Sequence, residues 1–330
     1  MALRLTTLAL LLPLTVFFIL LSAPRINHFW QDNTIHFYLV SVASLLAAAI
    51  SVGLIASARS IRETRILFLA LSFCSLGIIF AVHGLSTKGF LYDHHSAALL
   101  RSPWLSVLAG SIFAGLSVVN LPTLNRWQNQ NLSRVIFAGV SLLLVLYFAL
   151  SLAFPDWLEG FPTTKSWFRH LLAAIAISLL VFAAWRYFQS YLFARLPGQL
   201  AIVAGLLFLA EAQLFMDVGK AYHFSWWLYH PLFLVAFLAV LLGWGLEISR
   251  ARDVKAIAEA LLMRDAISQL KRGQTSRLIE LADQIEAHDL GTLHHVDRVA
   301  AYAYFIGKEM GLGPARLRTL TLAAQMHDIG

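Results

Sequence analysis

Eight long apolar runs constrain the fold of this chain more than any other feature of its sequence. Each run has about the 17–22 residues that an α-helix needs to cross the hydrocarbon core of a bilayer. The runs cover residues 5–21, 35–56, 66–85, 103–119, 135–154, 168–188, 200–218 and 228–248. Backbone groups in hydrocarbon must find hydrogen bonds within the protein, and a helix provides them within one segment. The sequence therefore predicts an all-α, polytopic helical bundle with about eight spans in a lipid bilayer.

The first run has a second interpretation. Arg4, the apolar core and the small residues that end at Ala23 also fit a cleaved secretory signal peptide. The run is long and continuous for such a peptide, so we favour a retained membrane helix. Its removal would leave the directions of the later spans unchanged.

Composition divides the chain near residue 248. Hydrophobic residues make up 59% of the whole chain and charged residues 13%, whereas about a quarter of the residues in a soluble domain are charged. The shortage of charge falls on the first part, and the remainder has the composition of a soluble protein. We expect a multi-pass membrane sensor domain over 1–248, a cytoplasmic connector helix over 249–276 and a further all-α domain over 277–330.

Basic residues in the connections indicate the orientation, because cytoplasmic loops of membrane proteins are enriched in Lys and Arg. With the N-terminus inside, the cytoplasmic side collects Arg4, Arg59, Arg62, Arg65, Arg126, Arg134, Arg186, Arg195, Arg250, Arg252 and Lys255. The other side collects Arg25, Lys88, Arg101, Lys165, Arg169 and Lys220. This bias predicts an inner-membrane protein with a cytoplasmic C-terminal domain. Most of the net charge of +7 is expected at the cytoplasmic side, where basic residues face anionic lipid. No nucleic-acid partner is therefore expected.

Histidine is distributed over the membrane region in a one-sided way. All eight histidines before residue 249 fall on the outer side, namely His28, His36, His83, His94, His95, His170, His223 and His230. They can be interfacial residues like tryptophan, but tryptophan occurs on both sides here. The alternative is an outer-face sensory site that binds a divalent metal or senses pH. Its predicted members are His36, His83, Asp217 and His230, since an ionisable group at membrane depth usually marks a polar pocket.

Three stretches around these histidines resemble a membrane sensory module that is fused to bacterial signalling enzymes. They read His36-Phe-Tyr-Leu-Val, His83-Gly-Leu-Ser-Thr-Lys-Gly and Trp226-Trp227-Leu-Tyr-His230. In that module the middle stretch usually has a proline where this chain has Lys88. The resemblance implies a sensory function for the membrane domain.

The connector is predicted to be one continuous helix. No Pro or Gly interrupts residues 246–272, and apolar residues recur there at helical spacing. This apolar stripe can pack on the chain's own C-terminal domain. It can equally form a parallel homodimer, in which sliding or rotation of the paired helices would carry a signal inward. Both interpretations stay open.

The C-terminal region combines histidine and aspartate in a spaced pattern. It reads Glu286-Ala-His-Asp289-x-x-Thr292-x-x-His295-x-x-Arg298-Val299 and then Ala323-Ala-x-Met-His327-Asp328-Ile-Gly330. Imidazoles and carboxylates bind the cations that phosphodiester hydrolysis needs. The joint pattern resembles the N-terminal part of an HD-GYP domain, which belongs to the HD superfamily of metal-dependent phosphohydrolases.

This resemblance implies a site and a substrate. His295, His327 and Asp328 would be metal ligands for iron or manganese, and cyclic di-GMP would be the substrate. The resemblance covers about residues 278–330, and the family's other ligands and its Gly-Tyr-Pro segment would lie beyond Gly330. We therefore expect a truncated domain without activity of its own. Two alternatives stay open: a phosphohydrolase for another nucleotide or phosphoester, and a non-catalytic membrane receptor with an HD remnant.

Overall fold

The computed structural model describes residues 2–61, 64–119, 130–194, 196–251, 295–312, 314–325 and 327. Within these ranges the chain forms helices joined by turns and has no strand. The first half contains α1 (Ala2–Ser22), α2 (Asn33–Ile61), α3 (Thr64–Leu85), α4 (Ala97–Ser117) and α6 (Gln130–Ala153). The second half contains α7 (Ser166–Ala194), α8 (Pro197–Val218), α9 (Phe224–Trp227), α10 (Tyr229–Ala251), α13 (His295–Glu309) and α14 (Pro314–Gln325).

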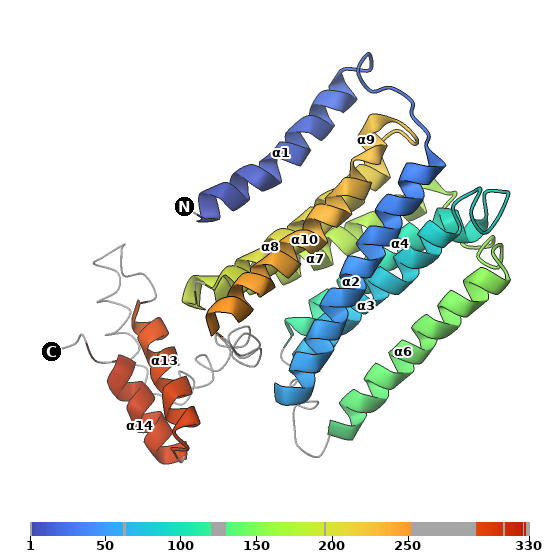
Figure 1. Cartoon of the computed structure of the whole chain (residues 1–330). Helices are drawn as coiled ribbons and strands as arrows, with labels where there is room; N and C mark the ends of the chain where they lie inside the picture. The colour runs from blue at the N-terminus through green and yellow to red at the C-terminus, as the bar shows by residue number, and fades with distance from the viewer. Residues whose placement is uncertain are drawn as a thin grey trace.

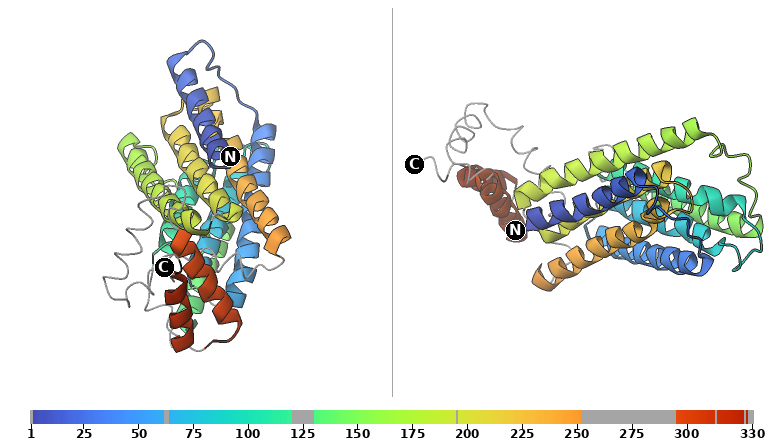
Figure 2. Two further views of the ribbon diagram at one scale, coloured as in Figure 1. Left: turned by 90° about the vertical axis from the view of Figure 1, so that its left-hand side faces the viewer. Right: turned by 90° about the horizontal axis from the view of Figure 1, so that it is seen from above.

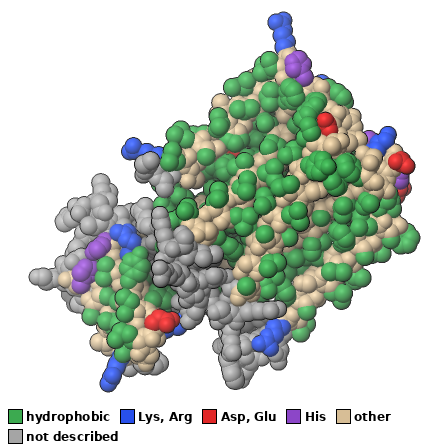
Figure 3. Space-filling model, in the orientation of Figure 1, with side chains coloured by type: hydrophobic (Ala, Val, Ile, Leu, Met, Phe, Trp, Pro, Cys, Tyr) green, Lys and Arg blue, Asp and Glu red, His purple; other side chains and the backbone are tan. Residues whose placement is uncertain are grey.

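Eight stretches of helix in the described chain are long and apolar enough to cross a membrane. The prediction of eight apolar helices of membrane-spanning length is therefore confirmed, which indicates a membrane protein. Figure 3 shows hydrophobic side chains over the broad face of the bundle, whereas most of the visible charged side chains lie toward its ends. This distribution is the one expected for a surface that faces lipid.

The helices differ in how much protein surrounds them. α3, α4 and α8 run through the interior of the bundle, whereas α1 and α6 are largely exposed at its edges (Figures 1 and 2). α1 is anchored through Phe17, whose ring stacks on Phe215 of α8 with centroids 4.2 Å apart. Close helix approach depends on small residues. At Gly205 in α8, an added Cβ would lie 3.1 Å from the carbonyl oxygen of Ala236 in α10.

The fourth helix begins earlier than the predicted start at Pro103. The Ser96 hydroxyl accepts a hydrogen bond from the backbone N–H of Leu99 at 3.2 Å and so caps α4 at residue 97. Pro103 therefore lies inside the helix. Because proline has no N–H, the carbonyl of Leu99 receives no helical hydrogen bond from position 103.

Alternating helix directions bring four connections to one end of the bundle (Figure 1). They are residues 23–32, 86–96, 154–165 and 219–223. A backbone hydrogen bond joins the first connection to the last, since Trp30 N donates to Tyr222 O at 2.8 Å. Another joins the start of α4 to the third connection, since Ala98 N donates to Pro155 O at 2.8 Å. The eight histidines named above lie in or beside these connections. We call this the histidine-rich end.

The C-terminal helices α13 and α14 form a hairpin near the opposite end of the bundle (Figures 1 and 2). Gly311 adopts a φ of 71°, which suits glycine after a helix, and Pro314 begins α14. Gly307 fits against Leu317, where an added Cβ would lie 2.8 Å from Leu317 Cδ1. The predicted connector beyond residue 251, the predicted helix over 277–290 and residues 328–330 lie outside the described residues.

Candidate functional site

Three histidines from three helices meet at the histidine-rich end. His36 lies in the first turn of α2, His83 near the end of α3 and His230 at the start of α10. All three are buried, with side chains at most 7% exposed. One ring nitrogen of each lies within 4.8 Å of a ring nitrogen of each of the others. We refer to these residues as the histidine cluster.

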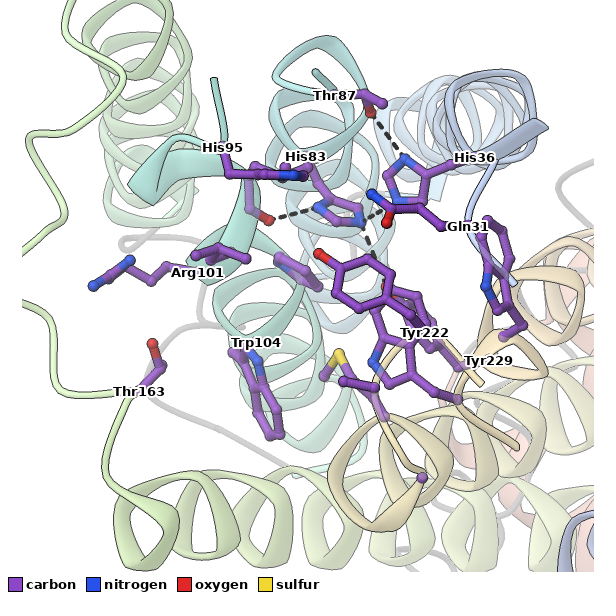
Figure 4. Close-up of a pocket in the computed structure, with 18 of the residues that line it drawn as sticks. Gln31, His36, His83, Thr87, His95, Arg101, Trp104, Thr163, Tyr222 and Tyr229 are labelled. Atoms are coloured by element: carbon purple, nitrogen blue, oxygen red, sulfur yellow. Dashed lines mark hydrogen bonds between the residues drawn. The ribbon is translucent and has the colours of Figure 1, made fainter. Parts of the chain in front are cut away.

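The closest contact in the cluster joins Nε2 of His36 to Nε2 of His83 at 2.9 Å (Figure 4). Nδ1 of each histidine faces away and has its own partner. His83 Nδ1 lies 2.7 Å from Leu99 O, and His230 Nδ1 lies 3.3 Å from Trp227 O. His36 Nδ1 lies 2.8 Å from the Thr87 hydroxyl. The Nδ1 contacts fix the rings so that Nε2 is the nitrogen left for the centre of the cluster.

Two prolines make these backbone acceptors available. Leu99 and Trp227 each precede a proline by four positions, namely Pro103 and Pro231. In a regular helix the N–H four residues later would bond each of these carbonyls, and proline has none to offer. The two carbonyls that receive histidine Nδ1–H groups are therefore ones that the sequence leaves without a helical partner.

Nε2 of His230 is buried and has no hydrogen-bond partner among the described residues. Such atoms are uncommon in proteins, because burial of an unpaired polar group is unfavourable. A further oxygen beside the cluster is the Tyr229 hydroxyl, which lies 3.4 Å from Nε2 of His83. The centre of the cluster thus gathers ring nitrogens and one phenol.

A cavity of about 420 Å³ opens beside the cluster and is lined by His36 and His83 (Figure 4). Aromatic side chains form much of its wall, including Trp104, Tyr222, Trp226 and Tyr229. Burial raises the pKa of the Tyr222 phenol, so this group is neutral at physiological pH. The volume of the cavity is that of a small-molecule site. The cavity is open, so it connects the cluster to the surface.

Asp217, the fourth predicted member of the outer site, lines this cavity but pairs with a different histidine. Its carboxylate lies 2.8 Å from Nδ1 of His170, at the start of α7. The end of α8 faces α7 here, so this carboxylate is directed toward α7. The structure therefore brings His36, His83 and His230 together and places Asp217 in a separate hydrogen-bonded contact with His170.

Sequence reasoning missed the groups that orient the cluster. Thr87 lies one turn beyond His83, and its side chain is 2% exposed. Leu99 and Trp227 contribute only their carbonyl oxygens, so their side chains gave no indication of the role. The available indication was a proline four residues after each carbonyl.

The second candidate site lies in the C-terminal hairpin. His295 is the first residue of α13 and His327 follows the end of α14, and the centroids of their rings lie 5.4 Å apart. His327 Nδ1 lies 2.9 Å from Ala324 O. Asp328, the third predicted ligand, lies outside the described residues.

Comparison with known proteins assigns no family. No protein-family model matches the chain, and no curated protein or solved structure matches it significantly. The similarity to HD-GYP domains therefore rests on the spaced residues of the C-terminal region. Among the described residues, the histidine cluster of the bundle is the group whose ring nitrogens are placed to hold a metal ion.

Proposed function

We propose that this protein is a bacterial inner-membrane signalling protein in which the membrane bundle controls a cytoplasmic, metal-dependent phosphohydrolase region. The observation that carries the proposal is the pairing of His295 and His327, whose rings lie 5.4 Å apart. The HD pattern of the sequence requires these two residues to share a metal, and rings at this distance are compatible with one. The connections on the side of the C-terminal region carry the excess of Lys and Arg, which supports a cytoplasmic location for that region.

His295, His327 and Asp328 would hold the divalent metal, with iron or manganese as the ions that the resemblance implies. Such an ion supplies the positive charge that phosphodiester hydrolysis needs. The imidazoles bind it as neutral ligands, and the carboxylate offsets part of its charge. Cyclic di-GMP is the proposed substrate, and another nucleotide or phosphoester is the alternative.

The experiment measures hydrolysis of cyclic di-GMP by the purified protein in detergent. The protein is expressed with any sequence that its reading frame encodes after Gly330. With Mn²⁺ or Fe²⁺ present, we expect hydrolysis of cyclic di-GMP and loss of both turnover and bound metal in His327→Ala and Asp328→Ala. His294→Ala is the matched control, because the HD pattern assigns His294 no role, and it should retain activity.

The other outcomes separate the alternatives. Hydrolysis of a different phosphodiester with the same dependence on His327 would change the substrate and keep the reaction class. A protein that neither holds metal at His295 and His327 nor turns over any phosphodiester would be a non-catalytic receptor.

A further inference from the structure

We infer that His36, His83 and His230 form a binding site for one divalent transition-metal ion, which they ligate through their Nε2 atoms. The site lies at the histidine-rich end and is reached from the cavity. The inference depends only on the geometry of the membrane bundle, so it stands or falls separately from the phosphohydrolase proposal.

Two of the three imidazoles are held in the tautomer that a metal requires. Carbonyl oxygens only accept hydrogen bonds, so Nδ1 of His83 donates to Leu99 O and Nδ1 of His230 donates to Trp227 O. A neutral imidazole with hydrogen on Nδ1 has a lone pair on Nε2. Histidines that bind metals in proteins commonly donate their other ring N–H to a backbone carbonyl or a carboxylate in this way.

The third imidazole can change its tautomer in place. The Thr87 hydroxyl both donates and accepts. When it donates to Nδ1 of His36, the ring hydrogen is on Nε2 and points to Nε2 of His83, which accounts for their 2.9 Å separation. When a metal binds, this hydrogen leaves Nε2 and one returns at Nδ1, where Thr87 accepts it. His36 is neutral before and after, so the number of protons does not change.

The buried Nε2 of His230 indicates that a bound ligand belongs at the centre of the histidine cluster. It has no hydrogen-bond partner among the described residues, and buried polar atoms nearly always have one. A water molecule could satisfy this one nitrogen but would leave the three rings unlinked. A metal ion accepts a lone pair from all three.

The ligand set selects the class of ion. Imidazole nitrogen suits Zn²⁺, Cu²⁺, Ni²⁺ and Fe²⁺, whereas Mg²⁺ and Ca²⁺ prefer oxygen. Nitrogens that share a tetrahedral zinc at ~2.0–2.1 Å lie about 3.3 Å apart. The cluster nitrogens already lie within 4.8 Å of one another, so small side-chain shifts complete the set. Three protein ligands leave a fourth position, beside which lie the Tyr229 hydroxyl and the cavity.

The test is zinc binding to the purified protein in detergent, measured as metal content after equilibrium dialysis. A His327→Ala background removes the contribution of the C-terminal site. Cobalt substitution adds a spectroscopic readout, because tetrahedral and octahedral Co²⁺ differ in their visible absorption. In this background we expect one zinc equivalent and a tetrahedral cobalt spectrum. Both should be weakened by about 100-fold or more in affinity in His83→Gln and His230→Gln.

His223→Gln is the matched control, since His223 is a half-buried histidine at the same end that lies outside the cluster and whose Nδ1 bonds Ala221 O. It should bind zinc as the background does. Circular dichroism and gel filtration establish that each variant is folded, and His36→Gln replaces any ligand variant that is not, with the same outcome deciding. The inference is overturned if the folded background binds no zinc, or if His83→Gln and His230→Gln bind it unchanged.

Discussion

Nε2 of His36 and Nε2 of His83 lie 2.9 Å apart across the interface between α2 and α3, although 47 positions separate the two residues in the chain. Two lone pairs at this distance would repel each other, so one hydrogen lies between the two nitrogens when no metal is bound. A metal that enters the cluster must displace this hydrogen. The partner on the far side of His36 therefore decides how readily the site is filled.

That partner is Thr87, and its hydroxyl gives the first prediction. Thr87→Val keeps the shape of the side chain but leaves Nδ1 of His36 without a partner, so zinc affinity should fall by about 10–100-fold. Thr87→Ser keeps the hydroxyl and should bind zinc almost as the unmodified protein does. Equilibrium dialysis measures both, and equal affinity in the two variants would remove Thr87 from the site.

The second prediction concerns the two prolines. Pro103→Ala and Pro231→Ala each supply an N–H that can donate to Leu99 O or Trp227 O and compete with the histidine Nδ1–H group. Zinc affinity should fall in both variants, by up to about 10–100-fold, although neither proline is a ligand. Pro13→Ala, which changes the proline inside α1, is the control. Unchanged zinc binding in both cluster variants would show that the carbonyls do not hold the tautomers.

The third prediction separates the histidine cluster from the nearby contact between Asp217 and His170. Asp217→Asn removes the charge that faces His170, and zinc affinity at the cluster should stay the same within experimental error. The sequence alone suggested Asp217 as a fourth member of the site. A large loss of zinc binding in Asp217→Asn would restore that assignment.

The fourth prediction tests helix packing. A methyl group at Gly205 would lie 2.7 Å from Val240 Cγ2 and 3.1 Å from Ala236 O. Overpacking of this kind destabilises a protein by about 1–3 kcal/mol, so Gly205→Ala should lower the unfolding temperature in detergent. Gly139→Ala is the control, since an added Cβ there meets nothing within 4 Å. Equal melting of the two variants would contradict the close approach of α8 and α10.

The fifth prediction concerns alkaline pH. Burial raises the pKa of the Tyr92 phenol, and the nearby Asp156 carboxylate raises it further. The folded protein therefore favours the neutral phenol, whose hydroxyl donates to Leu152 O. Its stabilising effect is complete below the ordinary tyrosine pKa of about 10 and is lost as pH rises through the higher pKa of the folded state.

The difference in phenolate absorbance between the native protein and Tyr92→Phe measures this titration. Its midpoint should lie above that of the same difference in denaturant. A midpoint at or below the denatured value would contradict the position of Tyr92 against α6.

The spans were predictable because each apolar run is continuous and only a helix satisfies its backbone in lipid. The start of α4 was not, because the buried polar residues Arg101 and Ser102 interrupt the apolar pattern. The Ser96 cap, which fixes the true start, is a single residue in a loop. Hydropathy therefore located the helix and missed its first turn.

The candidate site was predictable only in part, for a geometric reason. Topology placed His36, His83 and His230 at one depth on one side, but it carries no information about rotation around each helix axis. Asp217 has the same depth and faces another neighbour. The assignment of His295, His327 and Asp328 as metal ligands stays a prediction from the motif. The structure shows the rings of His295 and His327 next to each other.

His230 occupies the second position of α10, and the same helix continues without a described break to Ala251. At 1.5 Å per residue this distance is about 30 Å, roughly the thickness of the hydrocarbon core. Pro231 lies in the first turn, where a missing N–H leaves the rest of the helix intact. Any force on the His230 ring is therefore delivered to a continuous helix whose far end lies at the end of the bundle near α13 and α14 (Figure 1). An ion that joins His36, His83 and His230 would link α2, α3 and α10 at one end of the bundle and could thereby change the position of the whole of α10.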